Sequence, residues 1–385
     1  MGQLQIENIE LFKVPPRWLF LKVTTKGGIV GWGEPVVEGK ADTVATCVQE
    51  LSKYFIGRSA NDIEDIWQTI YRGGFYRGGP ILMSALAGID QALWDIKGKS
   101  LGVPVYELLG GAVRKKMKMY CWIGGDTPDV VIEQAQSKVK EGYTAVKMNA
   151  TGALEWIDST KKIKSVTKNI QLLREEFGDD LDIGLDFHGR VHKGMMKRLI
   201  TELEPYRPMF IEEPILGENN GVLEHIYSFT SIPIATGERM FSRWDFKELL
   251  HRGVVDIVQP DLSHAGGISE VRRIAAMAEA YDVALAPHCP LGPISLASAL
   301  QIDFTSINAF IQESSLGIHY NKGYDLLDYM ENPEVFDMED GYISLLKEPG
   351  LGVRIDEEKL RSAVKEGHQW SNPIWRNQDG SLAEW

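Results

Sequence analysis

The chain has 385 residues, of which 44% are hydrophobic and 25% are charged, a composition typical of soluble globular domains. Its net charge of −13 argues against a nucleic-acid or anionic-membrane surface, which would favour clustered Lys and Arg, but does not exclude a small anionic substrate. The chain is longer than an ordinary domain with one hydrophobic core, and even an α/β barrel spans only about 250 residues, so we expect two domains.

The cysteine content and the hydropathy pattern predict a cytoplasmic protein without membrane contact. Cys47, Cys121 and Cys289 form no CxxC pair, which predicts neither a disulfide framework nor a zinc knot and fits a reducing compartment. The N-terminus lacks a basic segment followed by an apolar run. No apolar stretch reaches the roughly 18 residues of a membrane span.

Residues 1–115 are predicted to form an α+β domain. Two strand-like segments flank a Gly-Gly turn within 19–34, which is typical of a β-hairpin, and a long apolar helical pattern follows at 81–99. Residues 321–385 are rich in turns and aromatic side chains. We expect this last segment to pack back on the N-terminal domain.

Residues 116–320 show the pattern of repeated βα units. Short apolar or β-branched runs alternate with amphipathic segments, which predicts a parallel sheet. One intervening helix is predicted at 242–253, between a Ser cap and a closing Gly. Eight such runs close most simply into a TIM-type barrel: 117–123, 143–149, 182–188, 209–214, 232–238, 256–262, 283–289 and 307–314.

Three acids lie at the predicted carboxyl ends of neighbouring strands, where α/β barrels place their functional groups. Asp186, Glu212 and Glu238 are spaced by one βα unit each, so we expect them at equivalent heights with converging side chains. Clustered carboxylates repel unless a cation neutralises them, and an all-oxygen ligand set favours Mg²⁺. The alternative, that each acid caps a helix or pairs with an arginine such as Arg239, is weaker for three acids at one register.

Two histidines stand beside carboxylates at the same predicted barrel end. Asp186 and His188 are two positions apart on a strand, so both are expected on one face. His288 follows the seventh strand, beside the strand that carries Asp261, and such a pair suits a general base near neutral pH. His264 and His319 lie in loops near the barrel mouth, and their roles stay open.

Several motifs distributed along nearly the whole chain resemble the enolase superfamily, in its mandelate racemase-like branch. They include VGWGEPV (30–36), GLDFHGR (184–190), FIEEP (210–214), QPDLSHAGG (259–267) and LAPHCPLGP (285–293). The resemblance implies an α/β fold in which an N-terminal α+β capping domain covers a (β/α)7β barrel. It also implies one Mg²⁺ per active site, held by Asp186, Glu212 and Glu238.

The resemblance further implies the dehydration of an aldonate to a 2-keto-3-deoxy acid. His288, paired with Asp261, would remove the C2 proton, and His188 would protonate the departing C3 hydroxyl. Glu313 would hydrogen-bond the substrate carboxylate. Racemases of the branch carry a second base, usually Lys, at the position of Asn149 here, so elimination is favoured over racemisation.

The resemblance implies a 2R acid sugar as substrate, with D-galactonate first and D-gluconate as the alternative. Asn149 is expected to hydrogen-bond the anionic substrate. From the N-terminal domain we expect hydroxyl contacts or lid closure by Arg17, Trp18, Tyr76 and Arg77, each of which could instead be structural. We also expect a homo-oligomer. A hypothesis of a different class is a non-catalytic enolase-like binding barrel.

Overall fold

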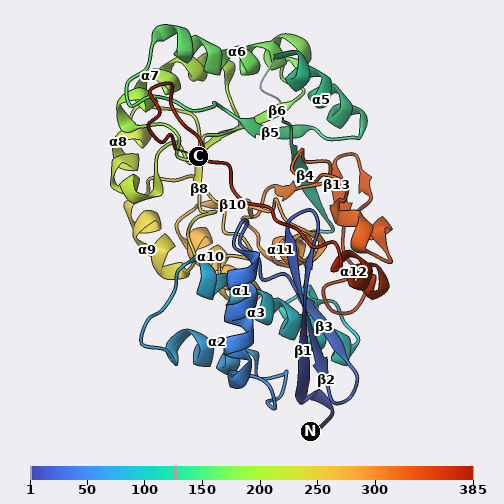
Figure 1. The fold of residues 1–385 in the computed structure, drawn as a ribbon. Helices are drawn as coiled ribbons and strands as arrows, with labels where there is room; N and C mark the ends of the chain where they lie inside the picture. The colour runs from blue at the N-terminus through green and yellow to red at the C-terminus, as the bar shows by residue number, and fades with distance from the viewer. Residues whose placement is uncertain (1, 125–127, 385) are drawn as a thin grey trace.

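The computed structural model describes residues 2–124 and 128–384 as one mixed α/β protein (Figure 1). The N-terminal part contains an antiparallel sheet of β1 (Ile6–Val14), β2 (Trp18–Thr25) and β3 (Val30–Gly33). The β2–β3 pairing confirms the predicted hairpin, and Gly28 of its turn has a φ of +81°. Helices α1 (Ala41–Leu51), α2 (Ile63–Arg72), α3 (Pro80–Leu101) and α4 (Val105–Leu108) complete this part.

Eight parallel strands and seven α-helices alternate in the described residues that follow, which is the (β/α)7β order. The strands are β4 (Lys116–Trp122), β5 (Ala145–Asn149), β6 (Asp182–Asp186), β7 (Phe210–Glu212), β8 (Ile234–Thr236), β9 (Ile257–Val258), β10 (Ala284–Leu285) and β11 (Gln312–Ser314). The helices are α5 (Pro128–Lys140), α6 (Thr160–Phe177), α7 (Lys193–Leu203), α8 (Leu223–Tyr227), α9 (Arg243–Arg252), α10 (Gly267–Ala280) and α11 (Pro293–Thr305).

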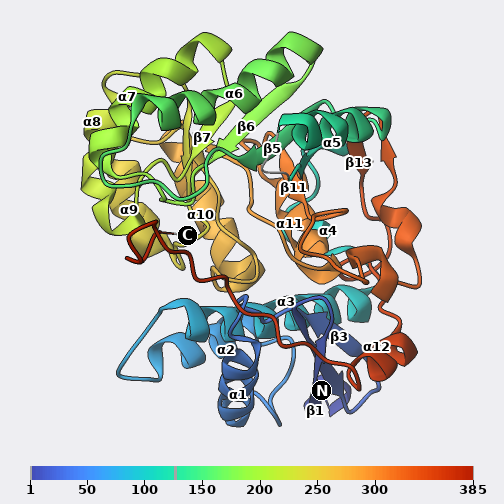
Figure 2. The ribbon, with the colours of Figure 1, turned by 45° about the horizontal axis from the view of Figure 1, so that its top comes forward.

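The strands close into a barrel because β11 pairs with β4 in parallel and a bridge joins Leu285 to Ala309. Figure 2 shows the helices around the outside of the sheet. Most strands are shorter than the predicted apolar runs, so several candidate residues lie on loops just beyond them. The predicted helix at 242–253 is confirmed as α9, with Gly253 left-handed at its end.

The barrel interior holds a small apolar cluster that includes Tyr120, Phe210 and Ile311. A larger core lies between strands and helices, and a third occupies the N-terminal domain. These layers bury the apolar face of each strand and helix, which is the main stabilising contribution in such a fold. No helix among the described residues is long and apolar enough to cross a membrane.

The C-terminal stretch packs against the N-terminal sheet, through the 3₁₀ segments and α12 (Glu357–Ala363). The Tyr329 ring makes edge-to-face contacts with Trp18 and Phe20, and its hydroxyl donates to the Pro15 carbonyl at 2.7 Å. Strands β12 (Met338–Glu339) and β13 (Tyr342–Ser344) form a hairpin that pairs with β4. The limits at residues 115 and 320 as domain boundaries stay a prediction.

Candidate active site

The site is a cavity of about 420 Å³ at the carboxyl ends of the barrel strands. Side chains from the barrel, from the N-terminal domain and from the C-terminal stretch line it. Among them are Arg17, Glu38, Trp122, Lys147, Asp186, His188, Glu238, His264, His288, Glu313, Tyr320 and Trp370. Charged and aromatic groups from three distant stretches of chain therefore face one cavity.

A cluster of two carboxylates and one imidazole lies in this cavity. Asp186 is the last residue of β6, His188 lies just beyond it, and Glu238 follows β8. One ligand atom of each residue lies within 4.8 Å of the others. His188 Nε2 is 2.8 Å from Asp186 Oδ2. The cluster therefore presents atoms of the type that hold a metal ion.

The predicted equal heights of the three acids are confirmed for two of them only. Asp186 pairs in register with Glu212 across β6 and β7, but Glu212 pairs with Ala235 on β8. Glu238 therefore lies three residues farther along, because 238 − 235 = 3, on the loop that follows Gly237. The prediction of equal height is wrong for Glu238, since equal spacing in sequence does not fix the register of a short strand.

The geometry that joins Asp186 and His188 also differs from the prediction. Strand β6 ends at Asp186, and His188 has a left-handed backbone with a φ of +48°. The His188 backbone N–H donates to Asp186 Oδ1 at 3.0 Å, so a turn, and not strand alternation, brings the ring beside the carboxylate. Such a conformation is uncommon outside glycine and indicates a locally constrained site.

Glu212 and Glu313 meet at Lys147, a residue for which the sequence analysis proposed no role. The Lys147 ammonium lies 2.9 Å from Glu212, 3.0 Å from Glu313 and 3.6 Å from Asp186. Its side chain is 1% exposed. The signal in the sequence was its position on β5, two residues before Asn149 and thus on the same face.

Carboxyl groups outnumber ammonium groups among the described residues of the cluster: Asp186, Glu212 and Glu313 share the Lys147 ammonium, and Glu238 lies 3.3 Å from the His288 ring. Burial and the Asp186 carboxylate raise the pKa of Glu212 well above its usual range. Burial alone would lower the pKa of Lys147, but Glu212 and Glu313 raise it well above its usual range. Oxygen-rich donors with uncompensated charge fit a hard divalent cation. Asp186, His188 and Glu238 present their ligand atoms within 4.8 Å of one another, and Glu212 lies beside them on Lys147.

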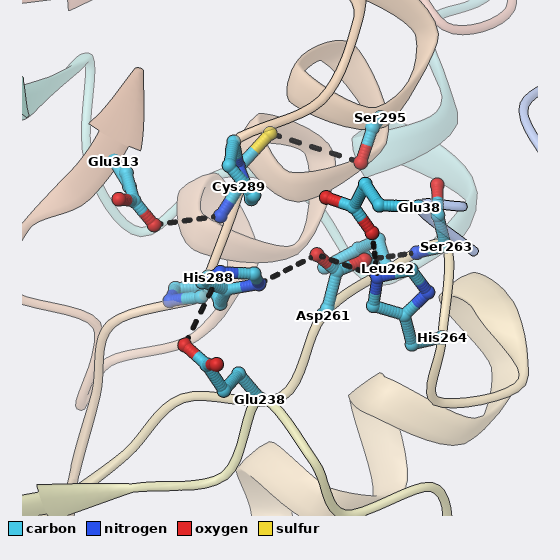
Figure 3. A network of polar contacts seen from close by, with 12 residues as sticks. Glu38, Glu238, Asp261, Leu262, Ser263, His264, His288, Cys289, Ser295 and Glu313 are labelled. Carbon is cyan, nitrogen blue, oxygen red and sulfur yellow. Dashed lines mark hydrogen bonds and ion pairs between the residues drawn. The ribbon is translucent and has the colours of Figure 1, made fainter. Parts of the chain in front are cut away.

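His288 lies between two carboxylates (Figure 3). Its Nδ1 is 2.8 Å from Oδ2 of the fully buried Asp261, and its Nε2 is 3.3 Å from Glu238 Oε2. Burial opposes protonation of the ring, but Glu238 and Asp261 raise the pKa of His288 well above its usual range. Asp261 also accepts the Ser263 backbone N–H at 2.6 Å, which holds it in place. The ring is therefore oriented on Nδ1 and presents Nε2 to the cavity.

Glu313 is the second residue of β11, and both groups that its carboxyl oxygens contact are donors. Its Oε2 accepts the Cys289 backbone N–H at 2.9 Å, and its Oε1 contacts Lys147. These contacts stabilise a carboxylate, so Lys147 is the donor beside Glu313 that can reach a substrate anion. The location of Glu313 matches the prediction, whereas its expected role as a hydrogen-bond donor to substrate stays a prediction.

The opposite wall of the cavity is polar and comes mainly from the N-terminal domain. Arg17 donates to Glu38 at 2.8 Å and to the Pro290 carbonyl at 2.6 Å. Glu38 Oε2 is 3.5 Å from His264 Nε2 (Figure 3). Burial opposes ionisation of Glu38, but His264 and Arg17 hold its pKa below its usual range. His264, left open by the sequence, thus belongs to this wall.

The predicted substrate contacts have different outcomes. Arg17 lines the cavity, whereas Trp18 is fully buried in the core against Phe20 and Tyr329 and does not line it. Apolar packing against the C-terminal stretch thus accounts for Trp18. Tyr76 is 87% exposed on the loop before α3, and neither it nor Arg77 is among the lining residues.

Asn149 ends β5 but does not line the cavity. Its carboxamide oxygen accepts a hydrogen bond from Arg190 at 3.1 Å. Arg190 is itself 1% exposed and also contacts His188 Nδ1 at 3.0 Å. Arg190 was not predicted as a site residue, although it stands two residues after His188 in GLDFHGR. The expected contact of Asn149 with substrate stays a prediction.

The arrangement can bind and transform a small hydroxy acid. The carboxylate cluster with a cation and Lys147 would hold the acid group and the charge that develops on it. His288 and His188 each contact a member of this cluster, so the two imidazoles flank the place where the substrate would lie. A base and an acid beside one electrophilic centre support proton abstraction next to a carboxylate, followed by elimination.

Two family models match the chain over most of its length. Residues 15–110 match the mandelate racemase/muconate lactonizing enzyme N-terminal domain, and residues 130–359 match the enolase C-terminal domain-like family. D-galactonate dehydratases from Pectobacterium atrosepticum and Ralstonia pickettii are each 57% identical to it over 382 residues, which is 99% of this chain and all of the relative.

Solved structures of the same fold agree with these matches. An enolase from Agrobacterium radiobacter, crystallised with Na and L-malate bound, is 30% identical with a TM-score of 0.90. That similarity covers 99% of this chain and 100% of the other. A mandelate racemase/muconate lactonizing enzyme from a Sulfitobacter species is 27% identical with a TM-score of 0.89, over 97% and 98% of the two chains. The chain belongs to the mandelate racemase/muconate lactonizing enzyme family of the enolase superfamily.

Proposed function

We propose that this protein catalyses the Mg²⁺-dependent dehydration of an aldonic acid, D-galactonate, to 2-dehydro-3-deoxy-D-galactonate and water. The observation that carries the proposal is the His288–Asp261 pair directed at the carboxylate cluster, with His188 on the same cluster. Full-length relatives at 57% identity that are D-galactonate dehydratases support the choice of substrate.

His288 is proposed to take the C2 proton on Nε2. Asp261 holds Nδ1 at 2.8 Å, which orients the ring and stabilises the imidazolium that forms. In the structure Nε2 also faces the Glu238 carboxylate, which favours the charged ring. Compensation of Glu238 by a cation would reduce this bias, so that His288 could act as a neutral base.

His188 is proposed to protonate the leaving C3 hydroxyl. The C2–H bond breaks first, its electrons delocalise into the carboxylate, and they then form the C2–C3 double bond as the C3–O bond breaks. Water leaves with the proton from His188, and the enol product ketonises to the 2-keto-3-deoxy acid. Asn149, at the position of the second base of racemases, cannot exchange a proton on the opposite face of C2, which favours elimination.

Asp186, Glu212 and Glu238 are proposed to hold one Mg²⁺ per active site. When bound, the ion would supply electrostatic stabilisation of the charge that develops on the substrate carboxylate. The superfamily generally pairs a Lys or His base with Mg²⁺. Lys147 and Glu313 are proposed to position the same carboxylate from the β5 and β11 side.

We also propose that the protein is a cytoplasmic homo-oligomer. The three free cysteines fit a reducing compartment, and Phe75 and Tyr76, exposed to 92% and 87%, offer apolar surface for self-association. Sedimentation of the purified chain tests the oligomeric state directly.

The test of function is turnover of a panel of acid sugars by the purified protein, followed as 2-keto acid with semicarbazide and reported as kcat/KM. We expect D-galactonate to exceed D-gluconate, its C4 epimer, and the 2S acid D-mannonate to be inert. Excess EDTA should abolish turnover and added Mg²⁺ should restore it. Turnover that ignores chelation would contradict the metal mechanism, and binding without turnover of any aldonate would favour a binding barrel.

A further inference from the structure

The last stretch of the chain reaches the active site. Figure 2 shows it leaving α12, crossing between the N-terminal domain and the barrel, and ending against the barrel. Trp370 and Asn372 of this stretch line the cavity, and the Trp370 ring lies 5.7 Å from the Arg17 guanidinium. The C-terminal segment, defined here as residues 368–384, is thus part of the cavity wall.

The C-terminal segment forms a small hairpin that places the Trp375 ring beside Arg190. The backbone N–H groups of Asn377 and Ala383 donate to the carbonyls of Ser381 and Trp375 at 2.9 and 3.1 Å, which closes a small hairpin. Arg376 and Leu382 form a bridge within it. The half-buried Trp375 ring then lies 4.4 Å from the Arg190 guanidinium, within the range of a cation–π contact.

Arg190 connects this ring to the residue proposed as the general acid. Its guanidinium donates to the Thr151 carbonyl at 2.7 Å and to Asn149 at 3.1 Å, both at the end of β5, and lies 3.0 Å from His188 Nδ1. An arginine side chain can only donate hydrogen bonds, so Nδ1 of His188 is the acceptor in this contact. The Nε2 edge, which would carry the proton, is left directed at the carboxylate cluster.

The His188 ring is therefore held on one edge and one face by groups outside the proposed reaction. Trp122 stacks on its face with an interplanar angle of 8°, and Arg190 fixes the Nδ1 edge. Trp375 adds a ring 4.4 Å from the Arg190 guanidinium, which is 1% exposed. Without the Trp375 ring, the Arg190 guanidinium would be more mobile and more exposed to solvent. His188 Nδ1 would then lose a hydrogen-bond donor that is held in a fixed position.

We propose that Arg190 and Trp375 are positioning residues for His188, so that the C-terminal segment controls the elimination step. The inference rests on the proposed function, in which His188 protonates the C3 hydroxyl. It predicts a specific kinetic pattern. Loss of positioning should slow dehydration while His288 still removes the C2 proton, because His288 is held by Asp261 and contacts neither residue.

The experiment compares Trp375→Ala, Trp375→Phe and Arg190→Lys with Ile374→Ala, a matched control in the same segment whose side chain is 77% exposed. Dehydration and exchange of the substrate C2 proton with D₂O are measured together at saturating D-galactonate and Mg²⁺. General acid catalysis contributes on the order of 10²–10⁴-fold, so partial loss of positioning should lower dehydration about tenfold or more. The ratio of exchange to dehydration should rise accordingly.

Trp375→Phe, which keeps a ring over the guanidinium, should recover much of the activity, and Ile374→Ala should match the wild type. If Trp375→Ala behaves as Ile374→Ala, or only raises KM, or lowers exchange and dehydration in parallel, the inference is wrong. Trp375 is not a core residue, so its variants should fold even if Arg190→Lys does not. A wild type that neither exchanges nor dehydrates any aldonate overturns the proposed function itself.

Discussion

At the scale of single residues, two histidines receive opposite roles from their neighbours. The Nδ1 of His288 faces the Asp261 carboxylate, an acceptor, whereas the Nδ1 of His188 faces the Arg190 guanidinium, a donor. In the neutral state the first ring therefore presents a bare Nε2 and the second presents Nε2–H. The difference depends on tertiary contacts, so a sequence that shows only two histidines near carboxylates cannot supply it.

This asymmetry gives a prediction for the two histidines separately. His288→Asn should abolish C2 proton exchange and dehydration together, because no other imidazole is oriented by Asp261 at Nδ1. His188→Asn should retain measurable exchange and lose dehydration by roughly 10²–10⁴-fold. Exchange is read by NMR in D₂O, with His225→Asn, exposed on α8, as the control. Loss of exchange in the His188 variant alone would reverse the two assignments.

The candidate site could be predicted from the sequence where strand ends determine it, and not where loops do. Asp186 and Glu212 are strand termini in register, and their neighbourhood follows from the βα repeat. Glu238 depends on the short β8 and the loop after it, and Arg190 on a turn with a left-handed His188. Turn and loop geometry of this kind leaves no periodic signal in the chain.

At the scale of elements, two carboxylates of the N-terminal domain each satisfy the start of a barrel helix. Glu34, just after β3, accepts the backbone N–H groups of Gly292 at 2.7 Å and Ser295 at 3.0 Å, at the start of α11. Asp90 of α3 accepts the Ser269 N–H at 2.9 Å, in the first turn of α10. The first N–H groups of a helix have no partner within it, so these contacts join the two domains through obligatory hydrogen bonds.

Glu34 should make this junction sensitive to pH. Burial raises the pKa of Glu34 to about 8, although its two N–H donors act in the opposite direction. A carboxyl whose folded pKa exceeds its unfolded value, about 4.3, stabilises the fold fully below that value and loses this contribution as the pH rises through 8. The Tm of wild type minus the Tm of Glu34→Gln should therefore fall steadily as the pH rises from about 5 to about 8.

Calorimetry from pH 5 to pH 9 measures this difference, and Asp90→Asn is the matched comparison. Burial raises the pKa of Asp90 to about 7, so the fall in the Tm difference between wild type and Asp90→Asn should end about one pH unit lower. At pH 5 both carboxyls are protonated in the folded state and either amide keeps the carbonyl acceptor, so each substitution should cost no more than about 1–3 kcal/mol there. If the Tm of wild type minus that of Glu34→Gln instead rises with pH, the hydrogen bonds to the Glu34 carboxylate outweigh the effect of its burial.

At the scale of the whole molecule, the fold was predictable because its repeat is regular, whereas the wall of the cavity was not. Alternating strands and helices, a hairpin and a long apolar helix all appear in the sequence as periods and turns. Glu38, His264, Tyr320 and Trp370 converge from four stretches whose separation in sequence gives no sign of contact. Trp18 lies in the core and Tyr76 is exposed, and neither lines the cavity, so their expected contacts with substrate stay predictions.

The carboxylate cluster should couple cation binding to the stability of the entire chain. Folding brings Asp186, Glu212 and Glu313 together around Lys147, with Glu238 close to Asp186, and a cation bound only by the folded state would compensate their repulsion. Such binding stabilises by about 2.7 kcal/mol at a ligand concentration 100 times Kd. Added Mg²⁺ should therefore raise the Tm of EDTA-treated protein by several degrees.

Asp186→Asn should abolish this Mg²⁺-dependent rise, because it removes a proposed ligand and one negative charge from the centre of the cluster. Glu248→Gln, whose side chain is 68% exposed on α9, should keep the full rise and controls for general ionic effects. The measurement is a thermal melt by circular dichroism at constant ionic strength, with and without Mg²⁺. An equal Mg²⁺-dependent rise in Tm in both variants would show that the cation binds elsewhere on the acidic surface. Lys147 would then offset the charge of the carboxylate cluster without a cation.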